Sequence, residues 1–385
     1  MVKLGDVCTI VSGTTPKSTQ PEYWDGDLNW VTPAELTEES NVIYESQRKI
    51  TQQAVIDSSL KSFPAGTVLL SSRAPIGKVA IAGTEMYCNQ GFKNLICSEN
   101  IYNRYLYHYL KGKAEYLNSL GRGATFKEIS KAIVENIEIP LPPLAEQRKI
   151  AAVLDKVSDL IAKRRQQLTK LDELVKSRFI ELFGMPGTDA FGWGLVPLGS
   201  TCNINPKKSL DSRLVSGAMV SFVPMPAVTE HGEIDATAIK EYDEVKTGFT
   251  YFAENDVLFA KITPCMENGK GAVAKGLHNG IGFGSTEFHV LRPISGKTDP
   301  YWIYTLTAFS QFRMDAASNM TGSAGQRRVP ASFLENYRVS LPPIALQEQF
   351  AAFVEQTDKS KLAIQKGLEQ LEMLKKALMQ KFFEV

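Results

Sequence analysis

The stretch LPPLAEQRKIAAVLD, residues 141–155, returns as LPPIALQEQFAAFVE at residues 341–355. This register of 200 residues then continues without a gap to Phe183 and Phe383. An earlier match pairs LGDVCTI, residues 4–10, with LGSTCNI, residues 198–204. Internal similarity of this kind indicates a duplicated structural unit. We therefore expect a variable segment and a constant segment, followed by a second copy of each.

The constant segments are predicted to be long helices. Pro142 and Pro143 precede residues 144–183, Gly184 follows them, and no proline or glycine lies inside. Such a helix would be about 60 Å long at ~1.5 Å per residue. Hydrophobic residues recur every seven positions, which is typical of helices that pack against a partner helix. We expect the two helices to lie against each other; the alternative is two ordinary surface helices on separate domains.

The variable segments have a different character. Short runs rich in β-formers are broken by glycine, proline and asparagine, and a helical stretch follows them. We predict strands at residues 67–70, 78–82, 256–262, 271–275 and 288–291, and helices at residues 104–120 and 300–316. Each segment is long enough for its own core. The predicted division is therefore an α+β domain (1–143), a helix (144–184), a second α+β domain (185–343) and a second helix (344–385).

Composition restricts the classes of function. The 385 residues include 43 basic and 42 acidic side chains, so a nucleic-acid-binding surface must be a local concentration of Lys and Arg. No stretch is apolar enough for a membrane helix. The cysteines are odd in number and form no C-x-x-C pair, so neither a disulfide framework nor a zinc site is indicated. We expect a protein of the reducing cytoplasm.

No catalytic constellation is evident. Gly280, Gly282 and Gly284 resemble a cofactor loop but precede a strand-like run, so we interpret them as tight-turn glycines. Asp299-Pro300 is interpreted as a turn that opens a helix. The four histidines lack metal-ligand spacing. The sequence therefore predicts a chain with no catalytic residues, no metal site and no bound cofactor.

Taken together, these motifs resemble a known family. The two LPP openings with their helices, the LGDVCTI and LGSTCNI starts, SRAPIG at residues 72–77 and GRGATFKEIS at residues 121–130 are similar to the specificity subunit of type I restriction-modification enzymes. The resemblance extends over essentially the whole chain. The second copy departs from the first where Leu346 replaces Glu146 and Phe350 replaces Ile150.

The resemblance implies an α+β fold with two target recognition domains, joined by two long antiparallel helices that form a coiled coil, in a pseudo-twofold internal repeat. Each domain would read one half of a bipartite, asymmetric site in double-stranded DNA, and the coiled coil would set the spacer. The chain would be non-catalytic. Two methylation subunits using S-adenosylmethionine would dock on it, and two restriction subunits using ATP and Mg would complete the complex.

Three alternatives remain open. The same subunit could serve a methylation-only DNA methyltransferase complex. The chain could instead be a stand-alone methyltransferase or nuclease, or a coiled-coil scaffold with no role on DNA.

Candidate DNA-binding residues follow from base chemistry. Arg suits guanine, and Asn and Gln suit adenine, when loops on a rigid body present them. In the first variable segment the candidates are Arg73, Lys78, Asn89, Gln90, Lys93, Arg122, Thr125 and Lys127. In the second they are Lys261, Thr263, Asn268, Lys270, Gln326, Arg327 and Arg328. Lys17, Lys207 and Lys208, which follow a proline in both copies, suit phosphate contact.

Overall fold

The computed structural model describes residues 1–37, 40–73, 75–123, 127–323 and 325–383. The chain folds into two compact units, of which unit 1 is Met1–Gln166 with Gln365–Val385 and unit 2 is Gln167–Ile364. Each unit combines one α+β region with a stretch of both long helices. We call residues 1–143 the first region and residues 185–343 the second region.

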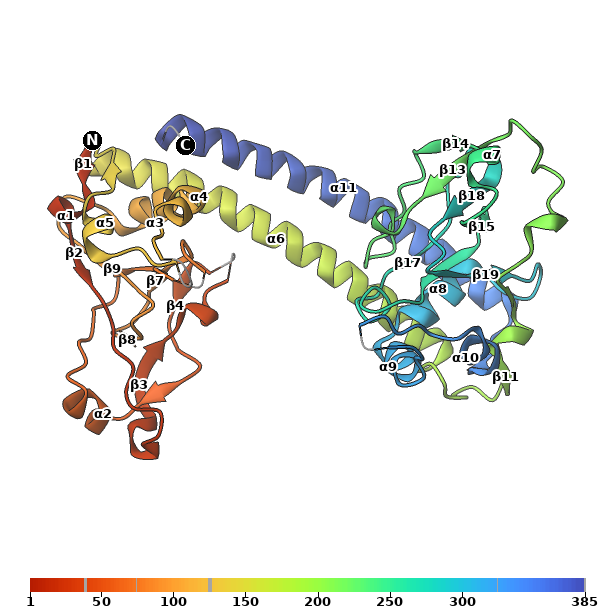
Figure 1. Cartoon of the computed structure of the whole chain (residues 1–385), viewed down its shortest axis with the longest axis horizontal. Coiled ribbons are helices and arrows are strands. Elements are labelled where there is room, and N and C mark those ends of the chain that lie inside the picture. The colour runs from red at the N-terminus through yellow and green to blue at the C-terminus, as the bar shows by residue number, and fades with distance from the viewer. Residues whose placement is uncertain (38–39, 74, 124–126, 324, 384–385) are drawn as a thin grey trace. The chain divides into compact units, whose positions relative to one another are not determined.

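The first region is built on a five-stranded sheet in the order β2-β9-β6-β7-β4. Figure 1 labels β2, β9, β7 and β4 of this sheet. Its neighbours are antiparallel except for the parallel pair β4 and β7. A second sheet has the order β5-β3-β8, and β1 pairs with β10. The strands are β1 (Val2–Lys3), β2 (Cys8–Val11), β3 (Trp24–Val31), β4 (Val42–Ile43), β5 (Lys49–Ile50), β6 (Val68–Leu70), β7 (Val79–Ala82), β8 (Tyr87–Cys88), β9 (Asn94–Cys97) and β10 (Glu138–Ile139).

Short helices pack against the two sheets of this region. The most important is α3, whose Tyr105, Leu106, Tyr109 and Leu110 fall on one helical face and are buried in the same core as the strands. The helices of the first region are α1 (Leu4–Val7), α2 (Gln52–Asp57), α3 (Asn103–Gly112), α4 (Ala114–Ser119) and α5 (Lys131–Glu135).

The second region contains two four-stranded sheets, β12-β19-β16-β17 and β14-β13-β18-β15, and the pair β11 and β20. Its strands are β11 (Leu195–Pro197), β12 (Cys202–Ile204), β13 (Met219–Val223), β14 (Ile239–Glu241), β15 (Thr250–Ala253), β16 (Val257–Ala260), β17 (Gly271–Val273), β18 (Ile281–Gly284), β19 (Phe288–Pro293) and β20 (Arg338–Ser340). Its helices are α7 (Tyr242–Val245), α8 (Pro300–Ala308), α9 (Ser310–Ser318) and α10 (Ala331–Asn336).

Four strands repeat between the regions. The order β2-β9-β6-β7 of the first matches β12-β19-β16-β17 of the second. The register matches too, because Val68 faces Leu95 and Val257 faces Leu291. Duplication is therefore visible in the strand pairing, even where the two sequences share few residues.

Two sequence expectations need correction. The helices predicted over 104–120 and 300–316 are each broken in two, at Lys113 and at Phe309. At Phe309 the backbone is extended and the ring packs against Phe179, so tertiary packing overrides the helical pattern. Gly282 and Gly284 are not turn residues but lie in strand β18, where a Cβ would overlap the Phe252 ring or the Val223 carbonyl. All five expected strands are confirmed, and Asp299 caps α8 by accepting a hydrogen bond from the Tyr301 amide.

The long helices are confirmed as α6 (Leu144–Phe183) and α11 (Ile344–Phe383), each of 40 residues. In unit 1, the start of α6 shares a core with Phe383 of α11, whose ring lies 5.1 Å from that of Tyr105. In unit 2, Phe350 of α11 packs against Phe179 and Phe183 of α6. Among the described residues, no helix is long and apolar enough to cross a membrane.

A repeated glutamine attaches each long helix to its region. Gln147 is fully buried; its amide donates to the carbonyls of Asn100 and Pro142, and its oxygen accepts from the Tyr102 amide at 2.8 Å. Gln347 makes the same three bonds, to the carbonyls of Lys297 and Pro342 and from the amide of Asp299. A buried side-chain amide is stable only when its hydrogen bonds are made. This requirement explains why glutamine stands at the same place in both LPP motifs.

Candidate nucleic-acid interface

The candidate loops of the first region meet at one end of its sheet. The Ser72 amide donates to the Gly91 carbonyl at 2.8 Å, which joins the loop after β6 to the loop before β9. Glu128 forms β-bridges with both Arg73 and Arg122, which adds the third loop. The structure thus brings together residues as far apart in the sequence as Arg73 and Glu128, which are 55 positions apart.

The candidates on these loops differ in how free their side chains are. Gln90, Arg122 and Lys127 are exposed, as is Lys17 on its own segment, whereas Arg73, Lys78 and Asn89 are half-buried. Asn89 accepts a hydrogen bond from the Gly91 amide, and Gln90 accepts one from the Thr15 hydroxyl. Thr125 lies outside the described residues.

Lys93 differs from the other candidates because its side chain is buried. Its Nζ lies 3.0 Å from the Glu128 carboxylate and 3.4 Å from the Ser72 hydroxyl. Only 9% of the Lys93 side chain is exposed. Removal of Glu128 would leave the buried Lys93 charge without this partner, which is costly. Lys93 therefore holds the loops together in this structure.

The candidate loops of the second region converge in the same way. The Thr263 amide donates to the Arg327 carbonyl, and the Val329 amide donates to the Lys261 carbonyl at 2.9 Å. Asn268, Gln326 and Arg327 are exposed at this end of the sheet.

Several candidates of the second region have partners within it. Arg328 makes a bidentate ion pair with Glu287, at 2.8 and 2.9 Å, and this pair lowers the pKa of the Glu287 carboxyl. Thr263 donates to Glu267, and Lys270 donates to the Val228 carbonyl at 3.2 Å.

One residue of this site has no signal in the sequence. Arg313 lies on α9 and is buried; it donates to the carbonyls of Met266 and Gly269, at 2.6 and 3.0 Å. Burial lowers the pKa of its guanidinium to about 10. These bonds hold the loop that carries Thr263, Asn268 and Lys270. An arginine within a helical pattern is ordinarily a surface residue, so only the tertiary structure identifies this role.

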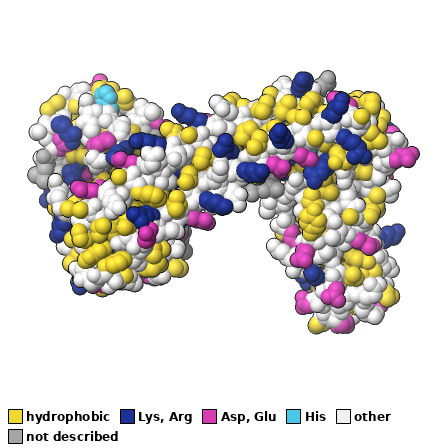
Figure 2. Space-filling view, turned by 180° about the vertical axis from the view of Figure 1, so that it is seen from behind, with side chains coloured by type: hydrophobic (Ala, Val, Ile, Leu, Met, Phe, Trp, Pro, Cys, Tyr) yellow, Lys and Arg dark blue, Asp and Glu magenta, His cyan; other side chains and the backbone are white. Residues whose placement is uncertain are grey.

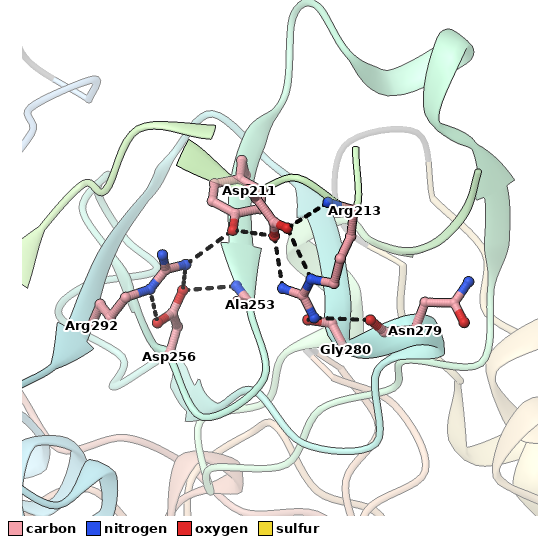
Figure 3. A network of polar contacts seen from close by, with 8 residues as sticks. Asp211, Arg213, Ala253, Asp256, Asn279, Gly280 and Arg292 are labelled. Atoms are coloured by element: carbon pink, nitrogen blue, oxygen red, sulfur yellow. Dashed lines mark hydrogen bonds and ion pairs between the residues drawn. The ribbon is translucent and has the colours of Figure 1, made fainter. Parts of the chain in front are cut away.

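The segment carrying Lys207 and Lys208 is held by a polar network (Figure 3). Asp211 accepts hydrogen bonds from Arg213 and from the Tyr251 hydroxyl at 2.7 Å, and these bonds hold the pKa of its carboxyl below the usual range. Arg292 pairs with Asp256 and also reaches Tyr251. Lys207 is exposed just before this network, whereas Lys208 donates to the Lys246 carbonyl.

Two histidines serve the packing of their regions. His108 of α3 lies 2.8 Å from the Asp155 carboxylate of α6, and His289 of β19 lies 2.8 Å from the Val329 carbonyl. Burial lowers the pKa of both imidazoles. A buried histidine held by a structural partner joins elements of the fold and needs no catalytic explanation.

Charge on the surface is mixed. On the face drawn in Figure 2, Lys and Arg side chains are interspersed with Asp and Glu over both regions. Nucleic-acid binding would therefore depend on local groups such as the exposed loop residues, in keeping with the near-zero net charge.

Comparison with known proteins identifies the family. The model of the type I restriction modification DNA specificity domain matches residues 1–171 and again residues 192–373. The specificity subunit of the type I restriction enzyme MjaIX from Methanocaldococcus jannaschii is 28% identical over 408 residues, covering 98% of this chain and 91% of that protein. The specificity subunit of the Escherichia coli enzyme EcoEI is 43% identical over 153 residues, which are 40% of this chain and 25% of that protein.

Solved structures share the fold. The S subunit of a type I restriction-modification system from M. genitalium superposes with a TM-score of 0.58 at 15% identity, covering 99% of this chain and 95% of that one. A chain from a study of complex assembly in the type I system gives 0.55 at 20% identity, covering 99% and 96%. With both halves matched by the family model, the chain belongs to the family of type I restriction-modification DNA specificity subunits.

Proposed function

We propose that this chain is the DNA sequence-recognition subunit of a type I restriction-modification complex, and that each region reads one half of a bipartite, asymmetric site. One observation carries the proposal. In each region, loops bearing Arg, Lys, Asn or Gln converge at one end of the same four-strand arrangement. A rigid sheet that presents such side chains suits the reading of base edges.

The exposed candidates are the ones suited to contact DNA directly. Arg122 and Arg327 can donate two hydrogen bonds to guanine, and Gln90, Asn268 and Gln326 can pair with adenine. Lys17, Lys127 and Lys207 suit the phosphates, which position a protein without specifying a sequence. All of these side chains are exposed.

The long helices are proposed to form an antiparallel coiled coil that relates the two regions as a pseudo-twofold repeat and sets the spacer. Contacts inside each unit support this idea. In unit 1, Arg165 pairs with Glu372 at 2.8 Å; in unit 2, Lys361 pairs with Asp172 at 2.6 Å. Within unit 2, α6 residues from 172 to 183 meet α11 residues from 361 to 350, so the helices run in opposite directions there.

Catalysis is assigned to partner subunits. We propose that this chain holds no cofactor of its own and scaffolds two methylation subunits, which use S-adenosylmethionine, and two restriction subunits, which use ATP and Mg. The specificity-subunit family is non-catalytic in general, which supports this division of labour.

The central test is methylome sequencing of a host that expresses the chain together with its methylation subunits. We expect a methylated motif with two specific halves separated by an unspecific spacer, absent when this chain is omitted. A contiguous motif, or DNA methylation by the purified chain alone, would contradict the proposal.

The spacer function has its own test. Four residues inserted after Lys163, with four more after Lys366 on α11, should lengthen the paired helices by about 6 Å. At ~3.4 Å per base pair, the unspecific gap should grow by about two base pairs. Gly367 lies beside Arg164, so the two insertions fall at the same level of the pair. Sequencing of the methylated motif measures the gap, and an unchanged gap would rule out the helices as the ruler.

A further inference from the structure

In each region the ends of one candidate loop are joined by a β-bridge, between Arg122 and Glu128 in the first region and between Thr321 and Arg328 in the second. The second residue of the bridge is acidic in the first region and basic in the second. Glu128 bridges Arg73 and Arg122, whereas Arg328 bridges Ile262 and Thr321. Glu128 and Arg328 are 200 residues apart, the same interval as the LPP repeat. The next residues agree as well, since the amides of Ile129 and Val329 donate to the carbonyls of Ser72 and Lys261.

The partners of these two residues come from the same strand edge. Lys93 immediately precedes β9, and Glu287 immediately precedes β19. The strand register aligns Lys93 with His289, and Glu287 with Gly91. When β9 and β19 are aligned, Lys93 and Glu287 are therefore two positions apart. Residues two apart along an extended chain point their side chains to the same face. Each region therefore has an ion pair between the end of this loop and the start of the strand, Lys93–Glu128 in the first and Glu287–Arg328 in the second, with the charges exchanged.

The geometry of both pairs suits an anchor. Lys93 reaches Glu128 at 3.0 Å and is buried, and Arg328 holds Glu287 through two parallel bonds. Bidentate pairs of this kind restrict orientation as well as adding energy. In each pair, one residue lies at the end of the loop and the other immediately precedes a strand of the sheet.

We propose that Lys93–Glu128 and Arg328–Glu287 are locks that fix each recognition loop against its sheet. In this assignment Lys93 and Arg328 are positioning residues, and the exposed neighbours Arg122, Lys127, Gln326 and Arg327 contact the DNA. The effect on base discrimination rests on the proposed function, whereas the lock itself does not. Because the polarities are opposite, a loop moved from one region to the other would bring like charges together unless its strand partner moved with it.

The test uses charge reversal in the complex with the methylation subunits. We expect K93E and E128K each to lower discrimination in the first half-site roughly tenfold, the order of cost of a mismatched base pair. The second half-site should be unaffected. The double variant K93E/E128K restores an opposite-charge pair and should recover discrimination to within about twofold. R328E, E287R and their double variant should behave in the same way at the second half-site. Selection from a random duplex library measures both halves at once.

K131E is the matched control. Lys131 pairs with Glu135 on α5 at 3.7 Å in the same region, and both side chains are substantially exposed. The same charge change there should leave both half-sites intact. Single variants that keep full discrimination, or double variants that fail to recover it, would overturn the proposal.

Two features keep the outcomes distinguishable. If the burial of Lys93 prevents its variants from folding, the Arg328–Glu287 pair, whose cation is more exposed, decides the question. Amide hydrogen exchange at Glu128 and Arg328 reports the lock without DNA, and exchange should accelerate in the single variants and slow again in the doubles. A wild-type complex that selects no bipartite motif would refute the proposed function, whereas unchanged exchange would refute the lock.

Discussion

The two regions share a strand arrangement but hold their candidate DNA-binding loops by different chemistry. In the first, the loop after β6 is organised from within, since the Ser71 hydroxyl donates to the Pro75 carbonyl and accepts from the Lys78 amide. In the second, the corresponding loop after β16 is held from outside by Arg313 of α9. The comparison shows that a duplicated sheet can keep its backbone while the contacts that position its loops diverge. Such divergence lets two copies of one fold present different surfaces.

The largest expected effect concerns the aromatic contacts that α11 makes within each unit. Phe350 is fully buried against Phe179 and Phe183, whereas Phe383 is the last residue of α11 and packs on Tyr105 and Tyr109. Phe350→Ala should destabilise unit 2 by about 3–5 kcal/mol. Phe383→Ala should cost less in unit 1, because a helix end can rearrange around the missing ring.

Hydrogen exchange in each unit measures the two losses separately. Leu374→Ala is the control, since Leu374 is 47% exposed and its truncation should change stability by no more than ~0.5 kcal/mol. Equal losses for Phe350→Ala and Phe383→Ala would show that the helix end is as rigid as its start.

An intermediate effect is expected from the two loop supports. Arg313→Met removes two hydrogen bonds from a charged donor, each worth roughly 1.5–3 kcal/mol, and should open the loop around Gly269. Ser71→Ala removes neutral bonds worth about 1 kcal/mol each and should loosen its loop less. Local amide exchange near Gly269 and near Lys78 measures the difference. Faster exchange near Lys78 in Ser71→Ala than near Gly269 in Arg313→Met would show that the loop of the first region depends more strongly on its support.

The smallest effect is a pH dependence common to both regions. Burial is the main cause that lowers the pKa of His108 and of His289 in the folded chain. A depressed folded pKa contributes stability that is full above the unfolded value of about 6.5 and is lost as the pH falls through the folded value. Both units should therefore weaken as the pH is lowered from 7 towards 5.

Denaturant unfolding at several pH values measures this slope. His108→Gln should flatten it in unit 1 and leave unit 2 unchanged, and His289→Gln should do the reverse. A slope that survives both substitutions would assign the pH dependence to other groups.

The secondary structure was largely predictable because its signals are local. Pro142, Pro143 and Gly184 delimit α6, and the seven-residue pattern predicts a continuous helix. The break at Phe309 was not predictable, because the alternative backbone is stabilised by a ring contact with Phe179, which is 130 residues away. The strand at Gly282 was missed because glycine there serves the close approach of Phe252 and not a turn.

The candidate site likewise was predictable where its signals are local and not where distant partners decide. Residue type and neighbouring glycine or proline were enough to identify loops that the structure brings together in both regions. They could not separate exposed Arg122 from paired Arg328, or exposed Lys127 from buried Lys93. Glu287 is 41 residues from its partner Arg328 along the chain, and Glu128 is 35 residues from its partner Lys93. Such distant partners decide which side chains are free.

By itself, the sequence determined the duplication, the two long helices and the residue types available for reading bases, because repeats, helix boundaries and side-chain chemistry are properties of the chain. Only the tertiary structure decided which of those side chains are available and which are committed to Glu128, Glu287 or a loop carbonyl. The physical reason is that an ion pair or a buried hydrogen bond depends on the distance between atoms, and folding sets that distance independently of separation along the chain.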